Sequence, residues 1–183
     1  MPQSLYLEDL AVGRLWTSPA RTITESDIVS FAGMTGDYDP LHVDHEYARQ
    51  TPYGKPIAHG LLGLSLMAGL SSNAPRVRTL ALVKVSDWQF QRPVYVGDTV
   101  HTVTQVESIT PRGRRSGEVV WFRKLVNQRD ECVQSGRIIT LVSSHSFLPR
   151  SQPIATGANL SKFKTVSADS VPEKETVDTL SNS

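Results

Sequence analysis

Residues 37–45, DYDPLHVDH, place three aspartates and two histidines around a single proline. Asp37 and His42 lie five residues apart across a turn at Pro40, so both side chains can converge on one water molecule. An imidazole with an unperturbed pKa near 6.5 suits proton transfer at neutral pH, and a carboxylate accepts hydrogen bonds from water. The spacing therefore predicts an acid–base pair that activates a water. It does not assign the two roles, because coupled groups titrate as a pair.

Each member of this segment also has a simpler interpretation. Asp37 can satisfy N–H groups of its own turn, and His42 can be a packed histidine. A metal site would use Asp37, Asp39 and His42, but their spacing matches no common helix-borne zinc pattern and supporting thiols are lacking. We therefore expect no metal and no other cofactor.

The elements before and after the pair must position it. Thr24 with Asp27 resembles a capping box that opens a helix, and Gly36 is a suitable end for that helix. Its apolar stripe consists of Ile28, Phe31 and Ala32. Residues 37–58 contain three prolines and are expected to be mostly extended or looped, with a short helix over 45–50 that Asp44 caps.

Residues 59–72, HGLLGLSLMAGLSS, are apolar on nearly every face and carry no charge, which predicts a helix buried on all sides. If it begins near His59, its first N–H groups are unpaired and partly positive, and Gly60 lets a ligand approach them. His59 is expected to orient the preceding loop or cap the helix. Ser65 is expected to bond back to a carbonyl, with contact to a bound substrate as the alternative. The core stripe is predicted to be Leu61, Leu62, Leu64, Leu66 and Met67.

After Pro75 the apolar pattern has a period of two, which is typical of strands. Four strands are predicted within residues 79–96, 98–110, 117–128 and 132–143, and an earlier one within 13–23. Turns at 110–117 and 127–131 connect neighbours. This layout predicts an α+β fold in which one antiparallel sheet curls around one helix.

Composition limits the function classes further. The chain has 183 residues and a formal net charge of +1, so we expect neither nucleic acid nor membrane as a partner. No apolar run reaches the roughly 18 residues that a membrane span requires. The single cysteine and the absence of a leader-like start predict a cytoplasmic protein. We expect one domain over residues 1–146, followed by a Ser/Thr/Pro-rich tail over 147–183 that is disordered or docked on a partner.

Three ordered motifs, FAGMTGDYDPLHVDHEYA, GKPIAHGLLGLSLMAGL and FQRPVYVGDTV, together resemble the MaoC-like (R)-specific enoyl-CoA hydratases. The similarity runs from about Ser26 to Val100, and the strand pattern extends it to about Ser144. The resemblance implies a hotdog fold, in which an antiparallel sheet wraps one long buried helix and short helices overhang it. It also implies a homodimer or higher homo-oligomer.

The same resemblance implies hydration of a trans-2-enoyl thioester, or the reverse dehydration, with an acyl-CoA or acyl-carrier-protein substrate. It implies catalysis by Asp37 and His42, and a thioester oxygen bound by the Gly60 N–H. His59 and Ser65 are the further substrate-binding candidates.

One residue departs from the family pattern, because Asp39 stands where asparagine is usual. An ionised aspartate cannot donate a hydrogen bond as an amide does, so Asp39 is a candidate modulator of pH dependence or substrate. Two other functions stay open: thioester hydrolysis on the same fold, and a non-catalytic acyl-thioester-binding subunit. Hydrolysis is less favoured because residues 60–73 contain no carboxylate.

Overall fold

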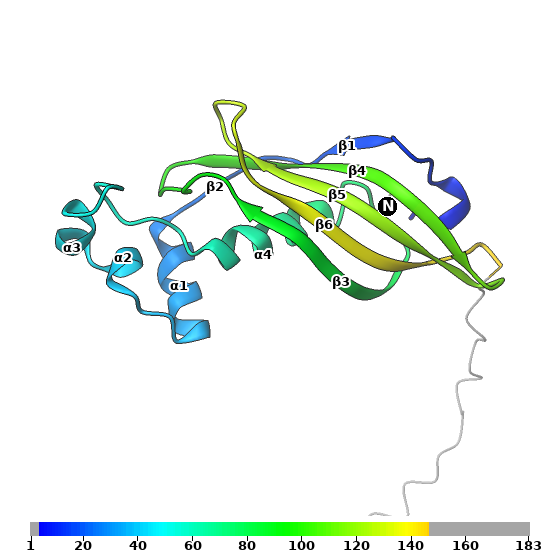
Figure 1. The fold of residues 1–183 in the computed structure, drawn as a ribbon, viewed down its shortest axis with the longest axis horizontal. Helices are drawn as coiled ribbons and strands as arrows, with labels where there is room; N and C mark the ends of the chain where they lie inside the picture. The colour runs from blue at the N-terminus through cyan, green and yellow to red at the C-terminus, as the bar shows by residue number, and fades with distance from the viewer. Residues whose placement is uncertain (1–3, 147–183) are drawn as a thin grey trace, which may run out of the picture. The chain divides into compact units, whose positions relative to one another are not determined.

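The computed structural model describes residues 4–146, and the tail predicted over 147–183 lies outside the described residues. A six-stranded antiparallel sheet dominates this part of the chain, with strand order β1-β4-β5-β6-β3 and β2 paired to β4 (Figure 1). The strands are β1 (Leu15–Thr17), β2 (Arg21–Thr22), β3 (Thr79–Phe90), β4 (Thr99–Arg112), β5 (Ser116–Val126) and β6 (Cys132–Ser143).

The four long strands predicted from the two-residue period are confirmed, with shifted ends. The early strand is in fact two short ones, β1 and β2, because Pro19 lies between them and lacks the N–H that a continuous ladder requires. A 3-10 helix at Leu7–Asp9, which the sequence did not indicate, precedes them.

The helices are α1 (Glu25–Thr35), α2 (Pro40–Val43), α3 (His45–Arg49) and α4 (Gly60–Ser71). The predicted capping box of Thr24 and Asp27 is formed, and Gly36 ends α1 in the left-handed conformation at φ 78°. Asp44 caps α3 as expected. The helix α2 corrects the expectation of a loop: its proline occupies the first helical position, where a missing N–H is harmless.

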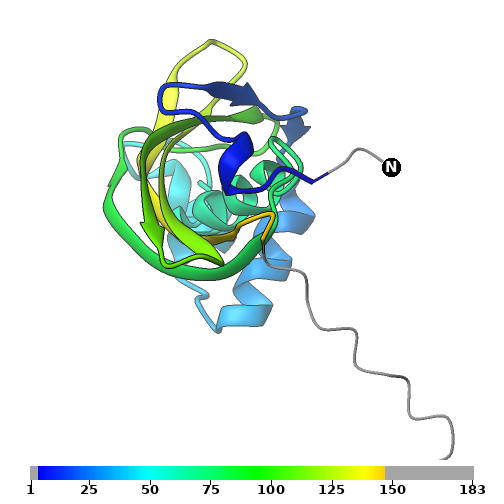
Figure 2. The ribbon, with the colours of Figure 1, turned by 90° about the vertical axis from the view of Figure 1, so that its right-hand side faces the viewer.

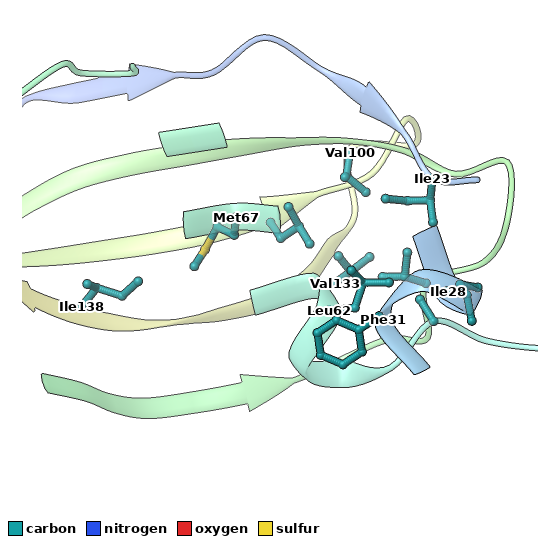
Figure 3. Packing of buried hydrophobic residues seen from close by; sticks show 11 residues of the cluster. Ile23, Ile28, Phe31, Leu62, Met67, Val100, Val133 and Ile138 are labelled. Carbon is teal, nitrogen blue, oxygen red and sulfur yellow. The ribbon is translucent and has the colours of Figure 1, made fainter. Parts of the chain in front are cut away.

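The curved sheet wraps around α4, and α1, α2 and α3 lie together beyond one end of it (Figures 1 and 2). Where α4 meets α1 and the sheet, an apolar cluster fills the interior; it includes Ile28, Phe31, Leu62, Met67 and Val133 (Figure 3). The cluster fixes the start of α4 relative to α1, and the loop between α1 and α2 carries Asp37.

The prediction that α4 is buried on every face is wrong for a single chain. Leu62, Gly63, Met67 and Ser71 are buried, but Leu61 is 60% exposed. The sheet covers only one side of the helix, so the apolar stripe is split between core and surface. Among residues 4–146, no helix has the length and apolar character that crossing a membrane requires.

Candidate active site

Asp37 and His42 come together at the start of α4. Asp37 follows the C-cap of α1, and His42 lies on α2, two residues after its first residue, Pro40. Together with His59, each offers an oxygen or nitrogen that lies within 4.8 Å of the other two. The structure thus brings together the two side chains that sequence spacing singled out, in a geometry that lets both contact one water.

One ring nitrogen of His42 is held in a hydrogen bond with the backbone. Its Nδ1 lies 2.7 Å from the carbonyl oxygen of Ile57, and a carbonyl only accepts, so Nδ1 carries the proton. The neutral ring therefore has a free lone pair on Nε2. This backbone contact fixes the tautomer in which Nε2 can act as a base.

His59 contacts both members of the pair. It is 2% exposed, and its Nε2 donates to the backbone oxygen of Asp37 over 3.0 Å. Its ring stacks on that of His42 with centroids 3.8 Å apart. These contacts fit the expectation that His59 orients the loop. Its other nitrogen, Nδ1, is buried without a hydrogen-bond partner in the described chain.

Gly60 opens α4 beside a cavity of about 250 Å³ that both it and His42 line. The N-cap residue, His59, makes no capping hydrogen bond with its side chain, so the first amides of α4 are left for a ligand. A side chain at Gly60 would come within 3.0 Å of the Phe90 ring. The site thus combines an acid–base pair with an accessible helix N-terminus.

Gln134, on β6, is a site residue that the motifs did not reveal. Its buried side chain lines the same cavity and donates from Nε2 to the Gly60 oxygen over 3.0 Å. A Cβ at Gly63 would collide with it, so that glycine makes room for the contact. The available signal was a polar residue at an inward position of an alternating strand.

Asp39 has a structural contact of its own. Its Oδ1 accepts the Leu41 N–H over 2.9 Å as the N-cap of α2, and its own N–H lies 3.3 Å from Asp37 Oδ1. Asparagine caps helices as well as aspartate does. The departure from the family pattern thus keeps the backbone geometry.

Ser65 lies one turn further along α4 from Leu61, and its hydroxyl donates to the Leu61 oxygen over 2.8 Å, as expected. It does not line the cavity beside Gly60. It lines a second cavity instead, between α4 and the sheet. Substrate contact by Ser65 stays a prediction.

Asp37, His42 and His59 could in principle hold a metal ion. However, His42 Nδ1 and His59 Nε2 each bond to a carbonyl, which leaves one nitrogen on each ring. The His59 nitrogen nearest the Asp37 carboxylate, 4.0 Å away, is one of the two already used. A metal ion could therefore use His42 Nε2 and the Asp37 carboxylate, but not the His59 nitrogen that lies nearest to that carboxylate.

Comparison with known proteins agrees with the motifs and the fold. Residues 11–125 match the family described as MaoC like domain. A 3-hydroxybutyryl-CoA dehydratase of Methylorubrum extorquens is 36% identical over 61% of this chain and 70% of its own. An (R)-specific enoyl-CoA hydratase of Rhodospirillum rubrum is 33% identical over 73% of this chain and 85% of its own. The crystal structure of a MaoC-like dehydratase from Rhodospirillum rubrum matches at 30% identity with a TM-score of 0.70, covering 76% and 97% of the two chains.

The chain belongs to the MaoC-like domain family, and its sheet wrapped around α4 is the hotdog fold. The predicted fold class is confirmed. The roles of the individual site residues stay predictions.

Proposed function

We propose that the protein catalyses the (R)-specific hydration of trans-2-enoyl thioesters, or the reverse dehydration of 3-hydroxyacyl thioesters. The relatives named as hydratase and dehydratase support this reaction class. The observation that carries it is that His42 lies within 4.8 Å of Asp37 and also lines the cavity at which Gly60 opens α4.

Asp37 and His42 hold the reacting water between them. As the water oxygen bonds to C3, His42 Nε2 takes one of its protons, while the Asp37 carboxylate accepts a hydrogen bond from the other. The pair then returns one proton to C2, which restores its protonation state. Because both groups lie on one side of the double bond, the hydroxyl and the hydrogen add to the same face.

The Gly60 N–H donates to the thioester oxygen, where negative charge develops as the water attacks. The first amides of α4 carry the positive end of the helix dipole, and they need no reorganisation when that charge appears. Neither this step nor the proton transfers require a cofactor.

The test is a steady-state assay with trans-2-enoyl-CoA, following loss of the enoyl absorbance, on wild type, Asp37→Asn and His42→Ala. Each variant should lose on the order of 100-fold or more in kcat/KM, because His42→Ala removes the base and Asp37→Asn removes the carboxylate that holds the water. His45→Ala is the matched control: His45 lies three residues on, exposed and paired with Glu25, and its loss should leave the rate unchanged. The product should be the (R)-3-hydroxyacyl thioester.

Two results would contradict the proposal. The first is full activity in Asp37→Asn or His42→Ala, and the second is free thiol release instead of hydration. Thiol release would indicate a thioesterase, for which α4 offers no carboxylate. Binding without turnover of any enoyl thioester would indicate the non-catalytic subunit instead.

We also propose that the active form is a homodimer paired along β3. This strand forms one edge of the sheet, and five of its exposed residues have large apolar side chains: Leu80, Leu82, Val83, Val85 and Phe90. A long, exposed, apolar edge is a template for pairing with another strand, and a second copy supplies a matching one.

A further inference from the structure

A second cavity, of about 500 Å³, lies between α4 and the inner face of the sheet. Leu64, Ser65 and Ala68 of α4 line one side, and Trp121, Arg123 and Ile138 of the sheet line the other. Ile138, labelled in Figure 3, also belongs to the apolar cluster of the core. The cavity is therefore the continuation of the core along α4, left unfilled.

One charged side chain, Arg123 of β5, faces this apolar space. Among residues 4–146, Arg123 takes part in no ion pair and donates no side-chain hydrogen bond. Its Nε is buried without a partner. The ring of Trp121 lies 5.8 Å from the guanidinium carbon, at the outer limit of a cation–π contact.

Thr104 adds a second unsatisfied group beside it. It is the registered partner of Arg123 on β4, so the two side chains share the inner face of the sheet. Its hydroxyl oxygen is also buried without a partner. Two neighbouring polar groups without partners are unusual in a core, where buried polar atoms are normally hydrogen-bonded.

Burial lowers the pKa of the Arg123 guanidinium to about 10, so the group still carries its charge at neutral pH. Arg123 is half-buried, and its Nε is buried without a partner. A partly desolvated charge without an opposite charge is destabilising. The fold keeps such a charge at this position, and a bound anion would neutralise it.

The second cavity lies further along α4 than the proposed reaction site, and the two cavities share no lining residue. Gly60, which is proposed to bind the thioester oxygen, precedes Leu64 by about 6 Å and Ala68 by about 12 Å along the helix axis, at 1.5 Å per residue. An extended chain advances about 1.2 Å per bond, so roughly five to ten bonds reach the cavity from the thioester. An acyl chain held at Gly60 that runs along α4 would therefore place its far end among the residues that line this cavity, Arg123 included.

We propose that Arg123 is a specificity residue that binds a carboxylate at the far end of the acyl chain, so that the preferred substrate is an ω-carboxylated enoyl thioester of medium length. A guanidinium forms a bidentate pair with a carboxylate, and the remainder of the cavity suits the methylene chain. This inference rests on the proposed function for the position of the thioester.

Equilibrium binding measurements test the proposed role of Arg123 without turnover. Two saturated acyl-CoA molecules of about eight carbons, one ending in a methyl group and one in a carboxylate, are titrated calorimetrically into wild type and Arg123→Met. Wild type should bind the carboxylate-ended chain about tenfold to a hundredfold more tightly, as expected for charge-assisted hydrogen bonds in a partly desolvated site. Arg123→Met should lose that preference and bind the methyl-ended chain at least as well as wild type does.

Lys124→Met is the matched control, because Lys124 is exposed on the opposite face of the same strand, and it should keep the wild-type preference. Thermal unfolding checks the fold of both variants. Arg123→Met should unfold at the same or a higher temperature than wild type, since it removes a half-buried charge that has no ion-pair partner.

Equal binding of the two chains by wild type, or a preference that survives in Arg123→Met, overturns the inference. Activity assays with the same two chains as trans-2-enoyl thioesters distinguish this inference from the proposed function. If wild type hydrates neither chain but binds the carboxylate-ended one preferentially through Arg123, the reaction assignment fails and the specificity inference stands.

Discussion

At the residue scale, backbone carbonyls decide which atoms of the site can react. Ile57 and Asp37 each take one ring N–H, from His42 and His59 respectively, and so leave His42 Nε2 free for the water. Sequence spacing predicted that Asp37 and His42 meet. It could not predict the tautomer, because Ile57 lies fifteen residues from His42 and their contact depends on the fold.

Asp39 shows how a departure from a family pattern can be neutral. We predict that Asp39→Asn keeps both the enoyl-thioester activity and the free energy of unfolding, since either side chain caps α2 through its oxygen. Asp39→Ala should lower the free energy of unfolding by about 1 kcal/mol, because Leu41 then loses its acceptor. Urea unfolding and the absorbance assay measure the two effects. An Asp39→Asn variant with activity that wild type lacks would show that the native protein is not the proposed enzyme.

The residues that sequence analysis missed, Gln134 and Arg123, share a signal. Both are polar residues at inward positions of alternating strands, Gln134 on β6 and Arg123 on β5. Their neighbours in space are known only from the pairing of strands far apart in the chain. The sequence marks such positions as unusual, but only the fold shows what they face.

At the element scale, local rules placed α1, α3 and α4 correctly, because caps and apolar periods are short-range properties. They failed at α2, where three prolines suggested a loop, although Pro40 at the first helical position favours a short helix. They failed again on the exposed side of α4. How many faces of a helix are covered depends on the extent of the sheet and on the oligomer, neither of which a local pattern encodes.

The capping box of α1 gives a prediction about pH. Desolvation raises the pKa of Asp27, but hydrogen bonds from the Thr24 N–H and hydroxyl, together with the Arg21 guanidinium, outweigh it and hold the pKa below its ordinary 3.8. The stabilisation is therefore fully present above the ordinary value and is lost as pH falls through the lower folded-state pKa. Asp27→Asn should reduce the free energy of unfolding by on the order of 1 kcal/mol at pH 7.

Urea unfolding of wild type and Asp27→Asn, repeated at pH values below 3.8, should show the difference between them shrinking. Asp27→Glu is the matched control: it keeps a carboxylate at the third helical position and should stay close to wild type at pH 7. A difference that does not change with pH would mean that Asp27 acts through packing and not through its charge.

At the scale of the whole molecule, β3 is an edge strand of the sheet in a single chain. The apolar side chains of this edge include Leu82 and Val85, which also line the cavity that holds Arg123. A second copy paired along β3 would cover these residues and close the open side of that cavity. We therefore predict that assembly and substrate binding are coupled through the same strand.

Val83→Lys tests this coupling. Val83 is 54% exposed, so a lysine is tolerated in a free monomer but places two like charges close together when β3 edges pair. Light scattering after size exclusion should show a dimer for wild type and a shift toward monomer for Val83→Lys, with kcat/KM lowered at concentrations where the variant is monomeric. Val12→Lys is the matched control, because Val12 is an apolar residue that is 64% exposed and lies outside β3. It should leave the oligomeric state and kcat/KM unchanged. A monomeric Val83→Lys with full activity would show that one chain builds the whole site, and a dimeric one would place the interface elsewhere.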